Sequence, residues 1–246
     1  MTTAIVLLAA GSLKGAFIPL LARFHQQTGI LVEAHFGPAG LLRERIEAGA
    51  PCSVFASANR QHPQALCLAG RAGECHSFAR NQLMLTARRA ASGDEADWLT
   101  LLTNPQLRLA TSTPGCDPSG DYTWQLFSRI EASFPGAGSA MMARAQQWVG
   151  GRQSLSVPPG ETAGAWLIRA GLTDLFIGYA HYARQMVMNE DLRTVAIPSP
   201  WNIEADYQLT TLDESAGAQR LCRFILGPEG QQFLQTAGFL PASAES

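Results

Sequence analysis

The sequence is poor in charge and in long apolar runs, and each shortage excludes a class of protein. Charged residues make up 15% of the 246 residues and the formal net charge is -2, so the basic excess of a nucleic-acid-binding protein is missing. The longest apolar run near the start, Ala4–Ala10, is far shorter than the ~20 residues that a membrane-spanning helix needs. Hydrophobic residues still make up 46%, an ordinary globular balance for one large domain or two smaller lobes.

Signals for export and for covalent catalysis are missing too. The first apolar run has no basic flank, so it does not resemble a signal peptide. We therefore expect either a cytoplasmic protein or one whose leader has been removed. The chain also lacks a G-x-S-x-G elbow, an H-E-x-x-H metal motif and a G-x-x-x-x-G-K-[ST] phosphate loop. These absences favour a binding protein over an enzyme, without a resident metal or cofactor.

Cysteine is scarce, with five residues at irregular spacing. An odd number without a recurrent pattern is a poor disulfide framework and a poor zinc site. We expect buried free thiols, and the alternative is a disulfide between Cys67 and Cys75 across a short loop.

What is present is an alternation of short apolar strands with helical patterns, typical of α/β proteins. A helix is expected from Leu13, and Pro19 should kink or restart it. The other expected helices cover 41–48, 122–134, 161–170, 214–226 and 229–237. The expected strands are Ala4–Ala9, Ile30–Phe36, Val54–Ser57, Gln82–Thr86, Leu107–Thr111, Leu175–Tyr179 and Thr194–Ile197.

Four segments share one design, in which small residues separate a strand end from a helix start. They are Gly11-Ser12, Pro38-Ala39-Gly40, Pro118-Ser119-Gly120 and Gly160-Glu161-Thr162. Each has two interpretations. The hydroxyl residues are helix N-caps, or the helix N-termini converge on an anion and need no Lys or Arg to bind it. Asp117 and Asp121, which flank Ser119, are similarly either turn residues or an acid/base or metal-ligating pair.

Several segments resemble the periplasmic molybdate-binding proteins, the solute receptors of molybdate ABC transporters. The resemblance covers nearly the whole chain in order, and it is looser between about residues 88 and 160. The segments that carry it are "AAGSLKGAF", "HFGPAGLLRERIEAGAPCSVFASAN", "FARNQLML", "LFIGYA" and "FILGPEGQQFLQTAGF".

The resemblance implies an α/β fold of the type II periplasmic-binding-protein class. Mixed sheets flanked by helices form two lobes that close on a ligand in the cleft between them. Lobe one is expected at 1–82 plus 203–246, and lobe two at 83–202. It further implies a monomeric periplasmic protein that binds molybdate or tungstate as an oxyanion and passes it to a membrane permease, with no nucleic acid as partner.

The resemblance also implies a set of anion-binding residues. Ser12 matches a serine that donates its hydroxyl and N–H, and Tyr179 matches a tyrosine whose hydroxyl reaches the anion. Ser119 and Thr162 match positions that give backbone N–H groups. Ala39 stands where the family usually has a second ligand serine, so one hydroxyl donor is missing.

Three alternatives to a molybdate or tungstate receptor stay open. The missing hydroxyl at Ala39 is offset by the hydroxyls of Ser119 and Thr162, or the preferred oxyanion is another one, such as sulfate. The same fold also serves as an intracellular anion-sensing module. In an enzyme of this fold, Cys116 or Asp117 would be the reactive group.

Overall fold

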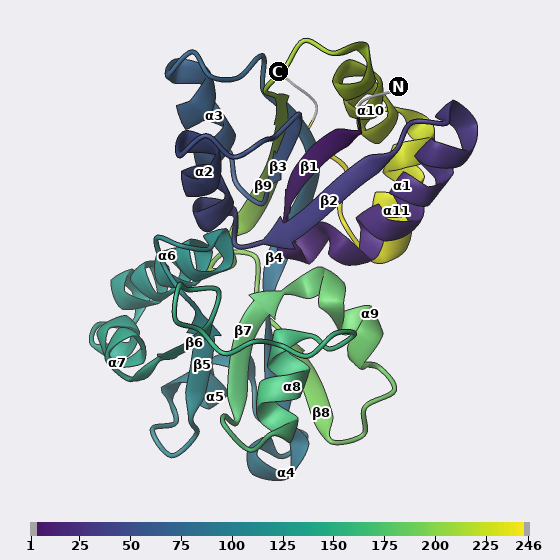
Figure 1. Ribbon diagram of the computed structural model, residues 1–246. Helices are drawn as coiled ribbons and strands as arrows, with labels where there is room; N and C mark the ends of the chain where they lie inside the picture. Colours follow the sequence, from purple (N-terminus) through teal and green to yellow (C-terminus); the bar gives the residue numbers. More distant parts are fainter. Residues whose placement is uncertain (1–3, 244–246) are drawn as a thin grey trace. The chain divides into compact units, whose positions relative to one another are not determined.

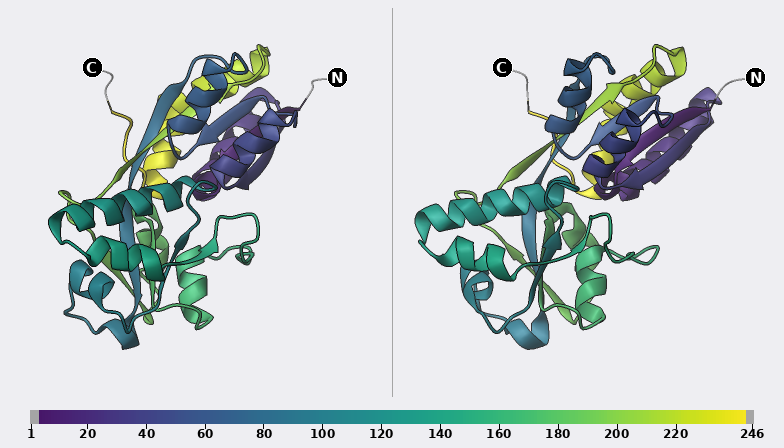
Figure 2. Two further views of the ribbon diagram at one scale, coloured as in Figure 1. Left: turned by 90° about the vertical axis from the view of Figure 1, so that its left-hand side faces the viewer. Right: turned by 60° about the vertical axis from the view of Figure 1, so that its left-hand side comes forward.

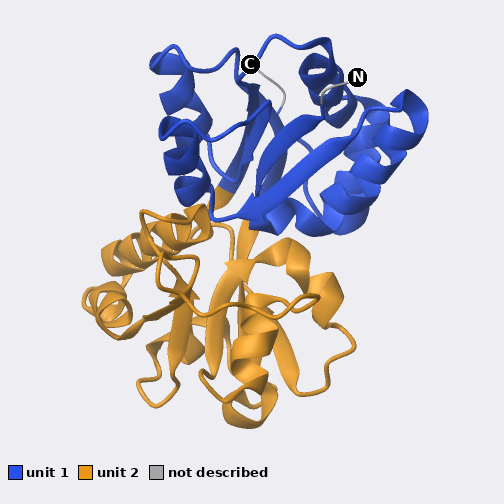
Figure 3. Ribbon diagram, viewed as in Figure 1, with its two compact units in different colours: residues 1–81, 205–246 blue, residues 82–204 orange. Residues whose placement is uncertain are grey.

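The computed structural model describes residues 4–243, which divide into two compact units. Unit 1 combines residues 1–81 with 205–246, and unit 2 is residues 82–204 (Figure 3). The chain therefore leaves unit 1, completes unit 2 and returns. The strand that leaves is β4 (His76–Arg88), and β9 (Glu204–Thr211) brings the chain back.

Unit 1 contains a mixed sheet in the order β2-β1-β3-β9-β4. The central strand β1 (Ile5–Ala10) pairs in parallel with both β2 (Val32–Gly37) and β3 (Val54–Ser57), and β9 is antiparallel to β3. Every residue of β3 is buried, as expected for a strand covered on both faces.

The helices of unit 1 form two groups on opposite faces of this sheet (Figures 1 and 2). The first group is α1 (Lys14–Thr28), α10 (Ala216–Leu226) and α11 (Pro228–Ala237), and the second is α2 (Ala39–Glu47) and α3 (Gln61–Leu68). Aromatic rings fill the core between the sheet and the first group. Phe78 contacts both Phe17 and Tyr207, with ring centroids 6.1 Å apart in each pair.

Unit 2 contains a second mixed sheet in the order β8-β4-β7-β5-β6. Strands β5 (Leu109–Ser112), β6 (Gln146–Val149) and β7 (Leu175–Tyr179) are parallel, with β5 in the middle. The long strand β4 is antiparallel to both β7 and β8 (Leu192–Ala196). The carboxyl ends of β5 and β7 therefore meet at one edge.

The two longest helices of unit 2 are α6 (Pro118–Ser133) and α7 (Ala137–Arg144), which pack on each other (Figure 1). Helix α8 (Ala163–Arg169) packs on β7. Shorter helices complete the unit: α4 (Arg89–Ser92), α5 (Trp98–Thr103) and α9 (Ala183–Met186), with a 3-10 turn, η2, at Ala180–Tyr182.

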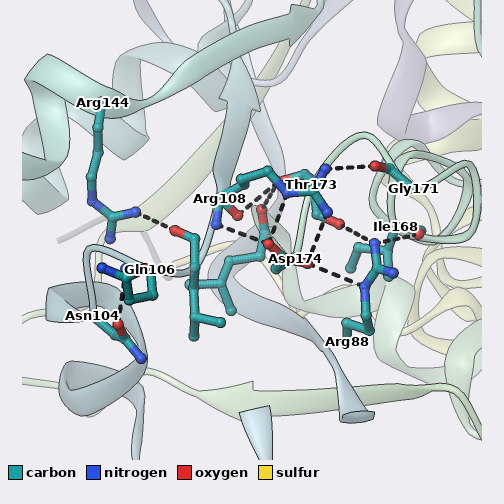
Figure 4. Close-up of polar contacts among 11 residues, drawn as sticks. Arg88, Asn104, Gln106, Arg108, Arg144, Ile168, Gly171, Thr173 and Asp174 are labelled. Atoms are coloured by element: carbon teal, nitrogen blue, oxygen red, sulfur yellow. Dashed lines mark hydrogen bonds and ion pairs between the residues drawn. The ribbon is translucent and has the colours of Figure 1, made fainter. Parts of the chain in front are cut away.

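A network of charged groups braces the amino-terminal edge of the β5 and β7 pair (Figure 4). Asp174 precedes β7 and receives three hydrogen bonds of 2.9–3.0 Å from Arg108, which precedes β5. Arg88, at the end of β4, lies 3.2 Å from the same carboxylate and donates to the carbonyls of Ile168 and Thr173. Hydrogen bonding from Arg108 and its positive charge hold the pKa of Asp174 below its usual value.

The expected elements agree with the structure where the apolar pattern is strong. Strands Val54–Ser57 and Leu175–Tyr179 have the predicted bounds. Pro19 does not restart the first helix, because α1 continues through it. The strands β6 and β9 and the helices α3, α5 and α7 were not expected. Within residues 4–243, no helix combines the length and apolar character needed to cross a bilayer.

Candidate functional site

Unit 1 brings two of the predicted anion-binding positions to one edge of its sheet. Ala10, the last residue of β1, pairs in parallel with Gly37, the last residue of β2. Ser12 and Ala39 each follow two residues later, at the starts of the 3-10 turn η1 (Gly11–Leu13) and of α2. A Cβ atom at Gly11 would lie 4.0 Å from the Gly37 carbonyl, so the two turns are in contact.

Ser12 is held by a tyrosine from a distant part of the sequence. Its side-chain oxygen lies 2.9 Å from the hydroxyl of Tyr207, a fully buried residue of β9. Ser12 lies inside η1, and the N-cap residues of η1 and α1 are Ala10 and Leu13. The contact with Tyr207 orients the Ser12 hydroxyl.

Unit 2 brings the other three positions to the carboxyl edge of its parallel strands. Ser119 lies in the first turn of α6, which follows β5, and Tyr179 is the last residue of β7. Thr162 immediately precedes α8, which runs back to the start of β7. Ser119 is 6% exposed and Tyr179 is 4% exposed. Unit 1 thus carries two of the five predicted residues at a carboxyl edge, and unit 2 carries the other three.

The helix starts at these positions lack a side-chain cap. None of η1, α2, α6 and α8 has a capping hydrogen bond from its N-cap side chain. Among the other helices, α5 and α10 have one: Asp97 accepts from the N–H of Thr100, and Ser215 accepts from the N–H of Ala218. The starts of α3, α4, α7, α9 and α11 lack one as well. An uncapped helix start leaves N–H donors and a partial positive charge for another acceptor.

Thr162 has a hydroxyl that the described part of the chain leaves unsatisfied. Its Oγ1 is inaccessible to solvent and has no hydrogen-bond partner among those residues. A buried hydroxyl without a partner costs free energy, because it has lost its bonds to water. A ligand oxygen at the start of α8 would remove that cost.

The tyrosine of unit 2 is held among aromatic rings. The ring of Tyr179 lies edge-on to Tyr122, with centroids 6.5 Å apart, and 6.2 Å from the ring of His181. Such contacts fix the ring plane and so fix the direction of the hydroxyl.

A partly buried carboxyl stands beside Ser119 in unit 2. Burial raises the pKa of Asp117 to about 6, although the Ser112 hydroxyl, 2.5 Å from its Oδ2, acts in the opposite direction. The carboxylate lies close to the Ser119 N–H, which also lowers the pKa, but the pair lacks the geometry of a capping hydrogen bond. Asp117 therefore braces the turn between β5 and α6.

The remaining candidates do not assemble into a catalytic or metal centre in the described residues. No group of three or more His, Cys, Asp or Glu residues with metal-binding geometry occurs in residues 4–243. Asp121 accepts a hydrogen bond from the Gly115 N–H, so it serves the turn before α6. The Cys116 sulfur lies 3.9 Å from a guanidinium nitrogen of Arg152.

Two functional neighbours were missed in the sequence. Tyr207 contacts Ser12 across 195 residues of sequence, in a strand that was not expected at all. Asp117 is predicted as a turn residue or as part of an acid/base or metal-ligating pair, and its bond to Ser112 is not predicted. The alternation of polar and apolar residues around Tyr207 is a local signal for a strand, but no local signal indicates its pairing with Ser12.

Comparisons with known proteins identify the family of the chain. The family model of the bacterial extracellular solute-binding proteins matches residues 5–240. An uncharacterized protein of Pasteurella multocida is 41% identical over 239 residues, which is 96% of this chain and 98% of that one. The molybdate-binding protein ModA of Escherichia coli is 27% identical over 140 residues, 52% of each chain.

Two solved structures resemble this chain in fold to the same degree. The periplasmic molybdate-binding protein of Azotobacter vinelandii has a TM-score of 0.76 and 21% identity, covering 97% of this chain and 100% of that one. The sulfate-binding protein SubI of Mycobacterium tuberculosis also has a TM-score of 0.76, with 17% identity, covering 97% of this chain and 87% of that one. The expected α/β periplasmic-binding-protein fold is confirmed. The chain belongs to the family of bacterial extracellular solute-binding proteins.

Proposed function

We propose that this protein is the receptor of an ABC transporter for a tetrahedral oxyanion, molybdate or tungstate. The two units act as its lobes, and each supplies part of the donor set: Ser12 and the Ala39 N–H from unit 1, and Ser119, Thr162 and Tyr179 from unit 2. The observation that carries the proposal is the buried Thr162 hydroxyl, which has no partner in the described part of the chain and stands directly before α8. The starts of η1, α2 and α6 add backbone N–H donors without side-chain caps. The partial similarity to the Escherichia coli molybdate-binding protein supports this choice of anion.

Neutral donors suffice for such an ion if there are enough of them. Dehydrating a dianion costs tens of kcal/mol on Born estimates, so many aligned N–H and O–H groups must replace its water. Helix N-termini add positive potential in the same direction. A site built only of donors also disfavours phosphate. Near neutral pH, phosphate carries a proton that needs an acceptor, whereas molybdate, tungstate and sulfate carry none.

The missing hydroxyl at Ala39 is offset in unit 2. A hydrogen bond to a charged group contributes roughly 1.5–3 kcal/mol, so its loss would be measurable. Thr162 supports the compensation, because its buried hydroxyl has no partner in the described part of the chain. In the proposed complex, this hydroxyl donates to the anion in addition to the backbone N–H groups of the α8 start.

The family supports a role outside the cytoplasm, with a membrane permease as partner and no cofactor. We propose a periplasmic, monomeric receptor that is not an enzyme. Molybdenum or tungsten would be bound only as the oxyanion, with no side chain ligating the metal.

Sulfate is the second candidate. The sulfate-binding protein of Mycobacterium tuberculosis matches the fold with the same TM-score as the molybdate-binding protein. The missing hydroxyl at Ala39 favours neither ion, because both are unprotonated dianions that accept the same donors. Cavity size must then decide between them.

Isothermal titration calorimetry with molybdate, tungstate, sulfate and phosphate tests the proposal. We expect tight binding of molybdate and tungstate and no detectable heat with phosphate. Tight binding of sulfate alone would establish the second candidate. Phosphate binding comparable to that of molybdate would refute a site that consists only of donors.

A further inference from the structure

The sulfur atoms of two cysteines in unit 1 lie unusually close together. Cys67 is in the last turn of α3, and Cys75 immediately precedes β4. Their Sγ atoms are 2.6 Å apart, closer than two non-bonded sulfur atoms approach and only slightly longer than the ~2.05 Å of a disulfide bond. A small movement of the two side chains would therefore bring the sulfur atoms to the distance of a disulfide bond.

The loop between the two cysteines is fixed independently of them. The N–H of Gly73 donates to the Thr211 carbonyl over 2.8 Å, and the N–H of Arg71 donates to the Leu66 carbonyl over 2.9 Å. Gly70 has a φ of 68°, which glycine adopts without strain. The backbone therefore holds the thiols together before any bond forms, which raises their effective concentration toward each other.

Loss of the thiol protons leaves no buried group unsatisfied. The Cys67 thiol now donates to the Gly73 carbonyl, with 2.7 Å between sulfur and oxygen. The same carbonyl also accepts from the Thr210 hydroxyl over 3.0 Å, so it keeps a partner once the thiol proton is gone. Formation of a disulfide therefore leaves the Gly73 carbonyl with a hydrogen-bond donor.

We propose that Cys67 and Cys75 are a modification site that forms an intramolecular disulfide in the presence of a disulfide oxidant, either a small organic disulfide or a protein of that class. One cysteine thiolate attacks the oxidant, which gives a mixed disulfide and releases one thiol. The second thiolate attacks the protein sulfur of that mixed disulfide and releases the second thiol. The two cysteines lose two electrons and two protons, and the oxidant is reduced to two thiols.

Burial governs how fast the bond forms. Burial, together with the neighbouring Cys67, raises the pKa of the Cys75 thiol to about 12. Since only the thiolate attacks, closure in a simple glutathione buffer is slow at neutral pH and faster at alkaline pH.

The bond acts on stability at a distance from the proposed anion site. Gly73 is bonded to Thr211, which pairs with Val54, the first residue of β3. Since β3 is parallel to β1, this is the sheet edge opposite to the one that Ser12 follows. We expect oxidation to raise the melting temperature by about 5–10 °C, from the closure of a short loop in the unfolded chain, with anion affinity changed less than twofold.

Thiol counting tests the proposal on the full chain. The protein is equilibrated with oxidised and reduced glutathione at pH 8, denatured, alkylated and analysed by intact mass and peptide mapping. Of the five cysteines, three should remain alkylatable, with Cys67 and Cys75 in one disulfide-linked peptide pair. Dithiothreitol should restore all five and lower the melting temperature.

Serine variants supply the controls. Cys67→Ser and Cys75→Ser should each abolish the redox-dependent shift in melting temperature, while Cys52→Ser should keep it. Five alkylatable thiols after oxidation, a stable glutathione adduct on either cysteine, or a bond to a different cysteine would each overturn the proposal. None of these results depends on anion binding, so the proposed function is tested separately.

Discussion

The two edges of the unit 2 sheet carry different kinds of side chain, charged at one edge and mostly uncharged at the other. At the amino-terminal edge of β5 and β7, the guanidinium groups of Arg108 and Arg88 both pair with the carboxylate of Asp174 (Figure 4). At the carboxyl edge of the same strands, the predicted binding residues are Ser119, Thr162 and Tyr179, and the helix starts lack side-chain caps. Charged side chains stabilise the first edge, and uncharged hydroxyl residues stand at the second.

Under the proposed function, the residues of the first edge stabilise the fold and the residues of the second edge bind the ligand. A charged pair stabilises only if its partners stay in place, so it suits an edge that does not change. A site that exchanges an anion for water is better served by hydrogen-bond donors without a permanent charge. When such a site is empty, water has little excess charge to solvate. The following experiments exploit this contrast, from the largest expected effect to the smallest.

The double variant Ser12→Ala with Tyr179→Phe tests the neutral donors directly. Each hydroxyl removed from a charged ligand should cost roughly 1.5–3 kcal/mol, so molybdate affinity should fall at least 100-fold. Calorimetry gives the affinity. The control Ser128→Ala removes an exposed hydroxyl on α6 that bonds only within its helix, and it should bind normally. Affinity that barely changes in the double variant would mean that these residues are not the site.

Asp117→Asn tests the carboxyl that lies beside Ser119 at the carboxyl edge of the unit 2 sheet. The pKa of Asp117 is about 6 in the folded protein against 3.8 for a free side chain, so the folded state binds its proton more tightly. Its contribution to stability is complete below about pH 4 and is lost as the pH rises through 6, by ~3 kcal/mol in total.

The variant lacks this titration. Urea unfolding at pH 4, 5, 6 and 7 should show its stability rising relative to wild type by about that amount across the series. Parallel stability curves for the two proteins would mean that Asp117 is not buried as described.

Asp174→Ala tests the charged edge. It removes the acceptor of three hydrogen bonds from Arg108 and leaves two guanidinium groups without their counter-ion. Because Arg108 is half exposed, water offsets part of the cost, and we expect ~2–3 kcal/mol of destabilisation. Thermal unfolding should show a melting temperature lower by about 5–10 °C. Anion affinity at 15 °C should be unchanged. A large loss of affinity would contradict the view that this edge only stabilises the fold.

Thr162→Val tests the unsatisfied hydroxyl. Without ligand, the variant should be as stable as wild type or more stable, because it removes a buried donor that has no partner in the described residues. With molybdate, the affinity should fall by about 10-fold. Thr162→Ser restores the hydroxyl and should restore binding. A variant that binds normally would show that this hydroxyl does not face the anion.

Ala39→Ser should have the smallest effect. It adds the hydroxyl that the family pattern has at the start of α2, and we expect molybdate affinity to rise by less than 10-fold. The position is fully buried, so the same calorimetric series should be run with Ala39→Gly, which tests whether small volume alone changes affinity. Weaker binding in the serine variant would mean that the site has no room for the hydroxyl.

Much of the fold follows from local patterns in the sequence. The strand Val54–Ser57 is predicted correctly because burial on both faces leaves a short, nearly continuous apolar run. The strand β9 has a local signal that the prediction leaves unused, because polar and apolar residues alternate strictly from Glu204 to Leu209. The strand β6, with the sequence QQWV, is too short and too polar to show a period.

The candidate site was less accessible from the sequence. The residue types at Ser12 and Tyr179 were found through family resemblance, since a serine after a strand is locally indistinguishable from a helix cap. The structure adds a side-chain partner of the Ser12 hydroxyl. For Ser12 that partner is Tyr207, and sequence spacing gives no information about a pair separated by 195 residues.

The return of the chain through β9 sets an order of assembly on the ribosome. Unit 2 is complete once residue 204 has been made, whereas the sheet of unit 1 still lacks the strand that pairs with β3. Until the last part of the chain is translated, β3 has an open edge of unpaired backbone groups, the kind of edge that pairs with other chains. The half of the molecule that is begun first is therefore finished last, and it is the half that needs protection during synthesis.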